Sequence, residues 1–404
     1  MSPRTTIDRD CVIAGGGPAG MVLGYLLARA GLRVTVLEKH ADFLRDFRGD
    51  TIHPSTITVL GELGLRERFL ALPLHRVQTM DIVVDDDRLT LVDFGTLPSP
   101  DDFLVFAPQW DLLDFLAREA AAFPHFELRM STEATGLVVE DDVVRGILAS
   151  GPEGDLELRA TLSVAADGRA SRLREVAGFA PEQLGAPIDV LWFDLPKPAD
   201  PPPPTLGYLD ARGMVLTIDR GDRYQAGMVI PKGALDALRD RGLDALQDAI
   251  AGIAPLLTPV VGSLVDWAQI KLLTVELSRL ETWHRDGLVV IGDAAHAMSP
   301  VGGVGVNYAI QDAVALANAV VAGLRAGRVS RGALDAFQRR RLDPVRRMQG
   351  IQRIVHGRIA GAAARGRALP RAVHSLLHLF APLVRRLTAR VIGRGFRPER
   401  VDPV

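Results

Sequence analysis

The sequence contains a single cysteine, Cys11, and few lysines and tyrosines. One cysteine excludes an internal disulfide and a metal cluster built from cysteines, so we expect no metal site. Lysine occurs only at positions 39, 197, 232 and 271, so the basic residues are almost all arginine. The formal net charge of -2 gives no electrostatic basis for binding nucleic acid.

Long apolar runs are lacking as well. The first ten residues, MSPRTTIDRD, include no apolar signal segment. No run of about 18 residues is continuously apolar, as a helix that spans a bilayer requires. We therefore expect no transmembrane segment and a cytoplasmic protein.

What the sequence does have is length and apolar content. Its 404 residues are 48% hydrophobic, which is enough for a large core and for two linked domains. Residues 10–40 predict one βαβ unit, with strands at 11–14 and 33–37 and a helix at 21–30 between them.

A glycine-rich turn, GGGPAG at 15–20, joins the first strand of this unit to its helix. Gly15 makes the tight turn, Gly17 lets the backbone approach a pyrophosphate, and Gly20 lets helix and strand pack closely. Glu38, about 20 residues further on, can accept hydrogen bonds from a ribose. The pattern predicts a dinucleotide site that takes FAD or NAD and does not suit a 2′-phosphate.

The run GDAAHAMSPVGGVGVN, residues 292–307, is the stretch around which the chain is organised. It follows a buried strand at 288–291 and leads into a helix from about Val306. Asp293 places a carboxylate beside bare backbone, and the glycines after Pro300 let the main chain lie flat against a ligand. The helix start aims free N–H groups at that ligand. An ordinary βα turn with an aspartate cap is the alternative for the Gly-Asp pair alone, but the whole run is much more specific.

The middle of the chain predicts a second sheet. Alternating residues at 76–94 around an acidic turn indicate a hairpin. Strand-like runs follow at 190–195, 214–218, 224–230 and 270–277, interrupted by one helix at 236–253. We interpret them as a mostly antiparallel sheet that covers a ligand. A second GxGxxG is missing, so a nicotinamide cofactor has no Rossmann unit of its own.

Two further segments complete the pattern before the C-terminus. Residues 109–122 predict a helix, and residues 126–165 predict several short strands that end at the Asp167-Gly168 turn. Residues 334–404 predict arginine-rich helices with an apolar face at Leu376, Leu377, Leu379, Phe380, Leu383 and Leu387. We favour a helix packed on the main body with its arginines in water over contact with a membrane surface.

Three motifs in this order resemble the single-component flavoprotein aromatic hydroxylases, the para-hydroxybenzoate hydroxylase-like group that includes the ubiquinone-biosynthesis hydroxylases. The motifs are GGGPAG with Glu38, ADG at 166–168 and the run at 292–307. The resemblance extends from about Cys11 to Phe337. It implies an α/β fold, α+β overall, in which a Rossmann-like FAD-binding domain is interleaved with a mostly antiparallel β-sheet substrate domain, with a helical C-terminus.

The same resemblance implies a discontinuous domain organisation. The FAD-binding domain would comprise residues 1–75, 95–182 and 278–340. The substrate-binding sheet would comprise 76–94 and 183–277, and the C-terminal helical segment 341–404. We expect no extra C-terminal domain of the kind found in the larger phenol hydroxylases.

Residue roles follow from the resemblance in the same way. The glycine turn would hold the pyrophosphate of non-covalent FAD, Glu38 its ribose, and residues 300–307 its isoalloxazine ring. A Cβ at Gly303 or Gly305 would then disturb the ring and not the fold. The expected cofactor-binding residues are Gly15, Gly17, Pro18, Ala19, Gly20, Glu38, Lys39, Arg48, Gln109, Asp167, Gly168, Gly292, Asp293, Pro300, Gly303, Gly305, Val306 and Asn307.

The activity implied by the resemblance is that of an FAD-dependent monooxygenase. NADH or NADPH binds transiently and reduces the flavin, O2 adds to give a C4a-hydroperoxide, and an aromatic or polycyclic molecule is hydroxylated. No side-chain acid or base is required. His53 and His296 are the titratable candidates near the motifs, and a structural role is the favoured interpretation for both.

Other functions stay open at this point. A halogenase or a double-bond reductase is an alternative flavin enzyme on the same fold, although the four tryptophans are too far apart for the WxWxIP motif of halogenases. A flavin-binding protein that does not turn over is an alternative of another class. The sequence leaves open the substrate, the choice between NADH and NADPH, and the oligomeric state.

Overall fold

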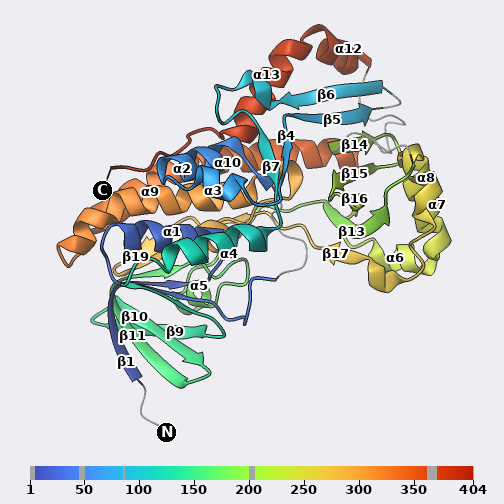
Figure 1. Cartoon of the computed structure of the whole chain (residues 1–404). Coiled ribbons are helices and arrows are strands. Elements are labelled where there is room, and N and C mark those ends of the chain that lie inside the picture. The colour runs from blue at the N-terminus through green and yellow to red at the C-terminus, as the bar shows by residue number, and fades with distance from the viewer. Residues whose placement is uncertain (1–4, 45–50, 85–86, 200–204, 362–370, 404) are drawn as a thin grey trace.

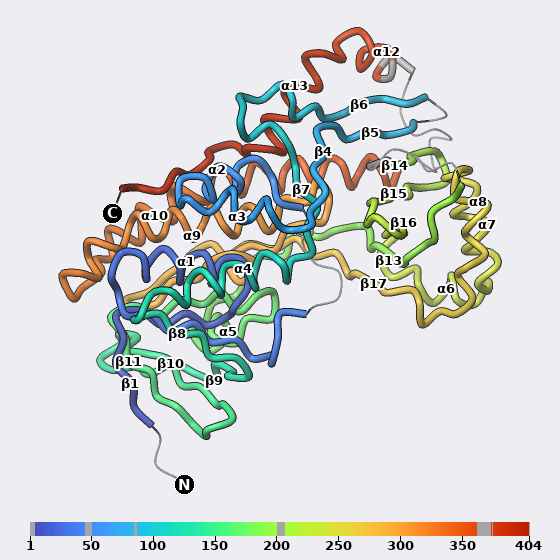
Figure 2. Tube along the Cα trace, in the orientation of Figure 1, coloured from blue at the N-terminus to red at the C-terminus, as the bar shows by residue number. Residues whose placement is uncertain are grey.

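The structure is a computed structural model, and it describes residues 5–44, 51–84, 87–199, 205–361 and 371–403. Two sheets dominate it, one at the lower left and one at the right of Figure 1. A layer of long helices lies above the first sheet, and the chain crosses repeatedly between the two halves (Figure 2). The α/β fold with a helical C-terminus is confirmed.

The first sheet is a mostly parallel sheet of eight strands in the order β19-β20-β11-β1-β2-β8, and β10 and β9 extend it from β11. β1 pairs in parallel with both β11 and β2, because its residues 11–14 are apolar and buried on both faces. The strands are β1 (Thr5–Ala14), β2 (Val34–Leu37), β8 (Phe126–Arg129), β9 (Glu133–Glu140), β10 (Val143–Gly151), β11 (Gly154–Ala165), β19 (His284–Arg285) and β20 (Leu288–Val290).

Helix α1 (Pro18–Arg29) packs between α4 (Gln109–Ala120) and α9 (Gly305–Arg325), and α10 (Arg331–Ala360) lies on α9 (Figure 1). Gly24 permits the close approach of α1 to the sheet, since a Cβ there would come within 2.8 Å of Val36. One helix of the described chain, at 301–325, is apolar and long enough to cross a membrane, and 78% of its apolar window is buried inside the protein.

Smaller elements surround this layer. α2 (Pro54–Glu62) and α3 (Arg66–Leu70) lie next to a three-stranded sheet of order β3-β7-β4, and α5 (Arg172–Val176) packs on β9. The strands and short helical turns are β3 (Thr51–Ile52), β4 (His75–Val77), β7 (Leu104–Phe106), β12 (Glu182–Gln183), β18 (Ser278–Arg279), η1 (Phe94–Thr96), η2 (Pro255–Leu257), η3 (Trp267–Gln269), η4 (Gly292–Ala294) and η5 (Val301–Gly303).

The second sheet has seven strands in the order β17-β13-β16-β15-β14-β5-β6, and only the β14–β5 pair is parallel. The expected hairpin at 76–94 is its β5–β6 pair. The strands are β5 (Thr79–Val84), β6 (Asp87–Asp93), β13 (Ile188–Pro196), β14 (Thr205–Leu209), β15 (Met214–Asp219), β16 (Arg223–Pro231) and β17 (Lys271–Leu273).

The expectation of one helix at 236–253 is wrong. The segment forms α6 (Leu235–Asp240) and α7 (Leu243–Ile253), because Gly242 adopts φ +88° between them, a left-handed conformation that ends a helix. A third helix, α8 (Thr258–Val261), joins them over one face of the sheet. The strand expected at 270–277 is also shorter than predicted and ends at Leu273.

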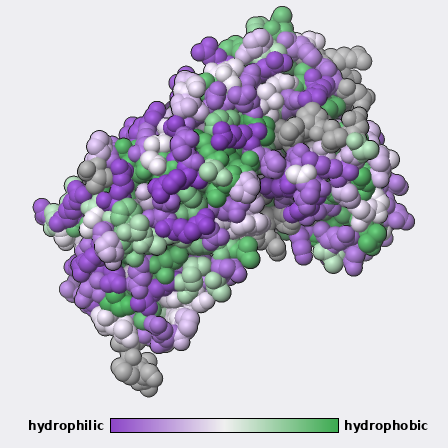
Figure 3. Space-filling model, viewed as in Figure 1, coloured by the Kyte–Doolittle hydropathy of each residue, from purple (hydrophilic) through white to green (hydrophobic). Residues whose placement is uncertain are grey.

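The C-terminal helices α12 (Arg371–Leu379) and α13 (Ala381–Gly393) lie beside β6 at the top of Figure 1. Their expected packing is wrong for most of the apolar face, because Leu376, Leu379, Phe380, Leu383 and Leu387 are exposed. α13 instead buries Ala389 with Phe94 and Leu97. Apolar side chains accordingly reach the upper surface of the molecule (Figure 3).

Candidate functional site

Three motifs meet at one edge of the first sheet. β1, β11 and β20 are neighbouring parallel strands, so the segments that follow Ala14, Ala165 and Val290 leave the sheet side by side. The Ala166 N–H donates to Ala14 O at 2.8 Å, and the Ile291 N–H donates to Ala165 O at 3.0 Å. The carboxyl edge of a parallel sheet is where such folds bind ligands.

In the glycine turn of residues 15–20, protein atoms exclude a side chain at Gly15 and Gly20 but leave open space at Gly17. Gly15 has φ +107°, and a Cβ on it would lie 2.2 Å from Ala166 O. A Cβ on Gly20 would lie 1.9 Å from Gly15 O, whereas one on Gly17 meets no protein atom within 4 Å. Pro18 and Ala19 begin α1, which has no side-chain cap and no acidic residue in its first turn. This opening suits a pyrophosphate.

Glu38 closes the same turn from the end of β2. It is 7% exposed, and its carboxylate accepts hydrogen bonds from the Gly16 N–H at 3.0 Å and the His40 N–H at 3.0 Å. Lys39, the next residue, is exposed, and Gln109 is half-buried at the start of α4. Arg48, the remaining expected contact of this region, lies outside the described residues.

Arg169, which follows the Asp167-Gly168 turn, forms an ion pair with Asp293 and so connects this turn to the Gly292-Asp293 segment. Arg169 Nε lies 3.1 Å from Asp293 Oδ2, and the Asp293 side chain is one-third exposed. Asp167 turns into its own loop, where Oδ2 accepts from the Leu173 N–H at 3.1 Å and Oδ1 accepts from Ser171. Burial raises the pKa of Asp167, and these hydrogen bonds oppose the rise. Asp293 is therefore the carboxylate of this pair that faces outward.

Gly292 lies between two helices. Its φ is +61°, and a Cβ on it would come within 3.3 Å of Ala19 and 3.4 Å of Ala309. The turn thus brings the start of α1 and the start of α9 together beside Asp293. Two helix N-termini converge on one carboxyl edge, which concentrates free N–H groups there.

The glycine loop before α9 presents bare backbone. Gly302 and Gly303 have φ +82° and +62°, and a Cβ on Gly303 would lie 2.3 Å from Thr51 Oγ1. The expectation that a side chain at Gly303 would disturb the ring and not the fold is therefore wrong, since a Cβ there would also strain the loop and clash with Thr51. Gly305 differs, because a Cβ there meets nothing within 4 Å. Pro300 and Val306 flank the loop and are half-buried.

Asn307 fastens this loop to the segment before α2. Its Oδ1 accepts from the His53 N–H at 2.9 Å and from Thr56 Oγ1 at 2.7 Å. Its Nδ2 donates to Thr51 O at 3.1 Å and to Gly303 O at 3.3 Å. The side chain is 3% exposed, so it shapes the loop from behind.

His53 is fully buried behind the same loop. Its Nδ1 lies 2.8 Å from Ile392 O. Burial lowers its pKa to about 4, although the hydrogen bond to the Ile392 carbonyl and the nearby Gly303 carbonyl oppose this. The imidazole is therefore neutral at pH 7.

His296 belongs to a buried charge network. Its Nε2 lies 2.6 Å from Asp312 Oδ2, which also accepts from the Gly292 N–H at 3.0 Å. Arg341 Nε donates to Asp312 Oδ1 at 2.8 Å, and Arg341 Nη1 lies 3.4 Å from Glu399 Oε1. Burial would raise the pKa of Asp312, but its contacts with His296 and Arg341 hold it below its ordinary value. The network supports the Gly292 turn from inside the protein.

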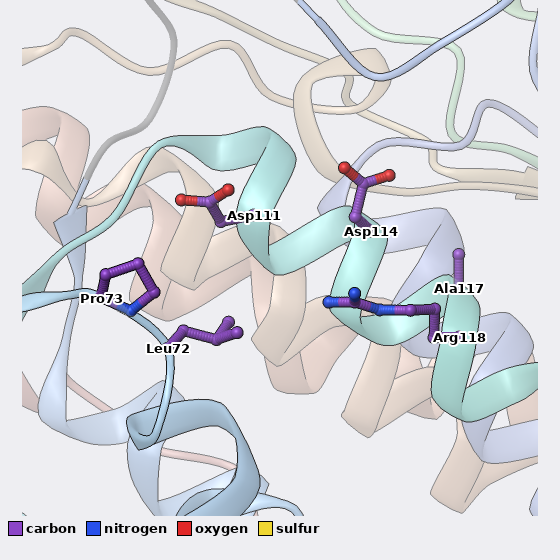
Figure 4. A pocket seen from close by; sticks show the side chains of 6 residues that line it. All are labelled: Leu72, Pro73, Asp111, Asp114, Ala117 and Arg118. Carbon is purple, nitrogen blue, oxygen red and sulfur yellow. The ribbon is translucent and has the colours of Figure 1, made fainter.

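A groove of about 470 Å³ lies elsewhere, between α4 and the segment after α3 (Figure 4). Leu72, Pro73, Asp111, Asp114, Ala117 and Arg118 line it. None of the motif residues contributes to it, so it is separate from the site described above.

Sequence reasoning missed several residues of the site. Arg169, Thr51, Asp312 and Arg341 act through contacts with segments 20 or more residues away. Their only signal was local: a charged stretch after Asp167 and an arginine-rich helix.

Comparison with known proteins agrees with this geometry. Residues 8–350 match the family described as "FAD binding domain". The chain is 33% identical over 396 residues to the 6-methylpretetramide 4-monooxygenase of Streptomyces rimosus, covering 96% of this chain and 94% of that protein. The chain therefore belongs to the FAD-binding-domain family, and it is an FAD-dependent monooxygenase.

Solved structures show the same fold. The p-nitrophenol 4-monooxygenase PnpA of Pseudomonas putida superposes with a TM-score of 0.78 at 19% identity, covering 96% of this chain and 97% of that one. The anhydrotetracycline hydroxylase OxyS of Streptomyces rimosus superposes with a TM-score of 0.76 at 24% identity, covering 96% of this chain and 76% of that one.

Proposed function

We propose that this protein uses NADH or NADPH and O2 to hydroxylate an aromatic or polycyclic small molecule through a flavin C4a-hydroperoxide. The observation that carries the proposal is the meeting of the three motifs at one carboxyl edge, with an open backbone at Gly17 and Gly305. The similarity to the 6-methylpretetramide 4-monooxygenase supports a polycyclic aromatic substrate.

The residues at this edge fit a non-covalent FAD. The turn at 15–20 and the start of α1 would hold its pyrophosphate, and Glu38 would accept hydrogen bonds from its adenosine ribose. Asp293, one-third exposed beside Arg169, would hold the ribityl chain or the pyrophosphate. When bound, the flavin supplies electron transfer and oxygen activation.

The protein's own contribution at the ring is electrostatic. The first N–H groups of α9 have no side-chain cap and no acidic residue in the first turn. They would stabilise negative charge on a ring placed against residues 303–307. We assign no acid–base role to His53 or His296, because both imidazoles are buried and bound within the protein.

The second sheet offers an apolar face for the substrate. α6, α7 and α8 cover one face, and the other face carries Val190, Trp192, Met214 and Val229. The Trp192 ring lies across Gly227, where an added Cβ would be 3.1 Å from it. We propose that residues 76–94 and 183–277 form the substrate domain, that 1–75, 95–182 and 278–340 form the FAD-binding domain, and that 341–404 form a helical appendage.

The test uses the purified full chain. Acid should release free FAD, and NADH or NADPH should drive O2 uptake that a tetracyclic aromatic polyketide stimulates. With ¹⁸O2 the product should gain one labelled oxygen by mass spectrometry. A protein that binds FAD but shows no stimulated uptake across phenolic and polyketide panels would overturn the hydroxylase proposal.

A further inference from the structure

Helix α10 presents a stripe of buried polar side chains to the segment that leads into the glycine loop. Gln349, Gln352 and His356 are each 0–1% exposed, and their spacing of three and four residues places them on one face of the helix. Polar side chains are rarely so deeply buried unless they are hydrogen-bonded. Their partners therefore define what this face does.

Gln352 binds the main chain of the loop at three points. Its Oε1 accepts from the Ser299 N–H at 3.2 Å, and its Nε2 donates to Ser299 O and to Val301 O, each at 3.0 Å. These bonds bracket Pro300, which has no N–H of its own to fix its position. One carboxamide thus sets the backbone on both sides of this proline.

His356 and Gln349 form further hydrogen bonds from α10 to this segment and to its neighbours. His356 Nε2 lies 2.7 Å from Ser299 Oγ, which in turn accepts from the Val301 N–H at 3.1 Å. Burial lowers the pKa of His356, which favours a neutral ring, and a neutral imidazole has one nitrogen that can accept a hydrogen bond from the Ser299 hydroxyl. Gln349 Nε2 donates to Ala297 O at 3.1 Å and to Ser278 O at 2.9 Å.

The bonds are directional, and that distinguishes them from ordinary helix packing. Apolar contacts would hold α10 near the loop without fixing the main chain, whereas paired amide bonds fix its position and rotation. The loop they fix is the one that turns at Gly302 and Gly303 and ends at the start of α9.

We propose that Gln352, supported by Gln349 and His356, is a positioning residue that sets the main chain of residues 299–303 against the flavin ring. This inference rests on the proposed function, because it takes residues 300–307 as the segment along the ring. It assigns part of the control over flavin reactivity to a helix outside the three motifs.

The test compares Gln352→Met with Gln338→Met on the same helix. Gln338 makes the same kinds of bond, accepting from the Trp283 N–H at 2.8 Å and donating to Glu281 O at 2.9 Å, but it holds the segment before β20. Both holoenzymes are measured for FAD content, visible flavin spectrum, flavin midpoint potential and the fraction of NAD(P)H oxidation that yields peroxide.

We expect Gln352→Met to keep its FAD, because the nucleotide turn is untouched, and to show a shifted spectrum and potential with several-fold more peroxide. Gln338→Met should lower the melting temperature and leave the spectrum, the potential and the peroxide fraction at wild-type values. Equal spectra, potentials and peroxide fractions in the two variants would overturn the proposal.

A second pair of variants, His356→Gln and His356→Leu, tests the proposal if Gln352→Met does not fold. His356→Gln retains an acceptor for the Ser299 hydroxyl, and His356→Leu removes it, so the flavin spectrum and potential should shift only in the leucine variant. Identical values in both would count against the proposal. A wild-type protein that binds FAD without hydroxylating anything would refute the proposed function alone, since the spectrum and potential still report on the loop.

Discussion

Replacing Gly305 by alanine separates a contact with the flavin from a requirement of the fold. Gly305 is the first residue of α9, and its φ lies outside the left-handed region. A Cβ built on it meets no protein atom within 4 Å. Because alanine restricts the unfolded chain more than glycine does, the apoprotein should gain about 0.4–1 kcal/mol of stability.

Although the apoprotein should become more stable, the reactivity of the bound flavin should fall. If the ring lies against this backbone, the new methyl group displaces it, and a shift of about 1 Å in a reacting geometry costs on the order of 10²-fold in rate. We expect Gly305→Ala to melt at or above the wild-type temperature as apoprotein. Flavin reduction should slow by about 10²-fold, and more of the O2 should be lost as peroxide.

The assay pairs stopped-flow anaerobic reduction with a melting curve on the same samples. Gly350→Ala is the matched control, because Gly350 is a helical glycine of α10 whose added Cβ also meets open space. Gly303→Ala should lose stability as well as activity, since φ +62° costs an alanine about 1–2 kcal/mol and the added Cβ would lie 2.3 Å from Thr51 Oγ1. Wild-type reduction and coupling in Gly305→Ala would refute the placement of the ring.

Three further predictions follow from the site. Asp293→Ala should weaken FAD binding by about 10- to 100-fold, because a hydrogen bond to a charged group contributes about 1.5–3 kcal/mol. Calorimetric titration of the apoprotein with FAD measures the affinity, and an unchanged affinity would contradict the role assigned to Asp293. NADH and NADPH should bind weakly to the oxidised enzyme, since the sequence has one Rossmann fingerprint; stoichiometric tight binding at equilibrium would exclude this. The folded pKa of His53, about 4, lies below its ordinary value of 6.5, so the unfolded chain takes up a proton first as pH falls. This one group should therefore lower the unfolding free energy of the wild-type protein by about 3 kcal/mol between pH 6.5 and 4, and urea titrations should show a loss that is smaller by about this amount for His53→Gln.

The fold was predictable where the signal was local. The turn at 15–20 lies between its own strand and helix, and the contact that excludes a side chain at Gly20 is with Gly15 O of the same unit. The run at 292–307 is equally self-contained, because strand, turn and helix start follow in one stretch. The hairpin of β5 and β6 was predictable from alternation alone.

The remainder depends on contacts between distant segments. In the sequence, Asp312 is a single acidic residue on an apolar helix. Only the fold brings His296, Arg341 and the Gly292 N–H within hydrogen-bond distance of its carboxylate. Gly303 faces Thr51 across about 250 residues of sequence, so the reason for that glycine could not be read from the loop.

The C-terminal helices show the same limit. Their leucines repeat at helical spacing. This spacing predicts an apolar face on the helix, but it does not show whether other parts of the protein pack on that face. The packing of α13 on β6 buries a different stripe, around Ala389. The amide stripe of α10 was invisible for the opposite reason, since glutamines on a helix ordinarily indicate a solvated face.

Glu399 gives the buried charge of Arg341 its second carboxylate, and Arg340 Nε also binds it at 2.6 Å. Because the ribosome makes this segment after the strands, the glycine turns and α9, the network behind the cofactor edge stays incomplete until Glu399 has been made. We therefore expect the cofactor edge to become fully ordered only after residue 399 has been made. Nascent chains stalled before Glu399 should be protease-sensitive around residues 292–312 even when FAD is abundant.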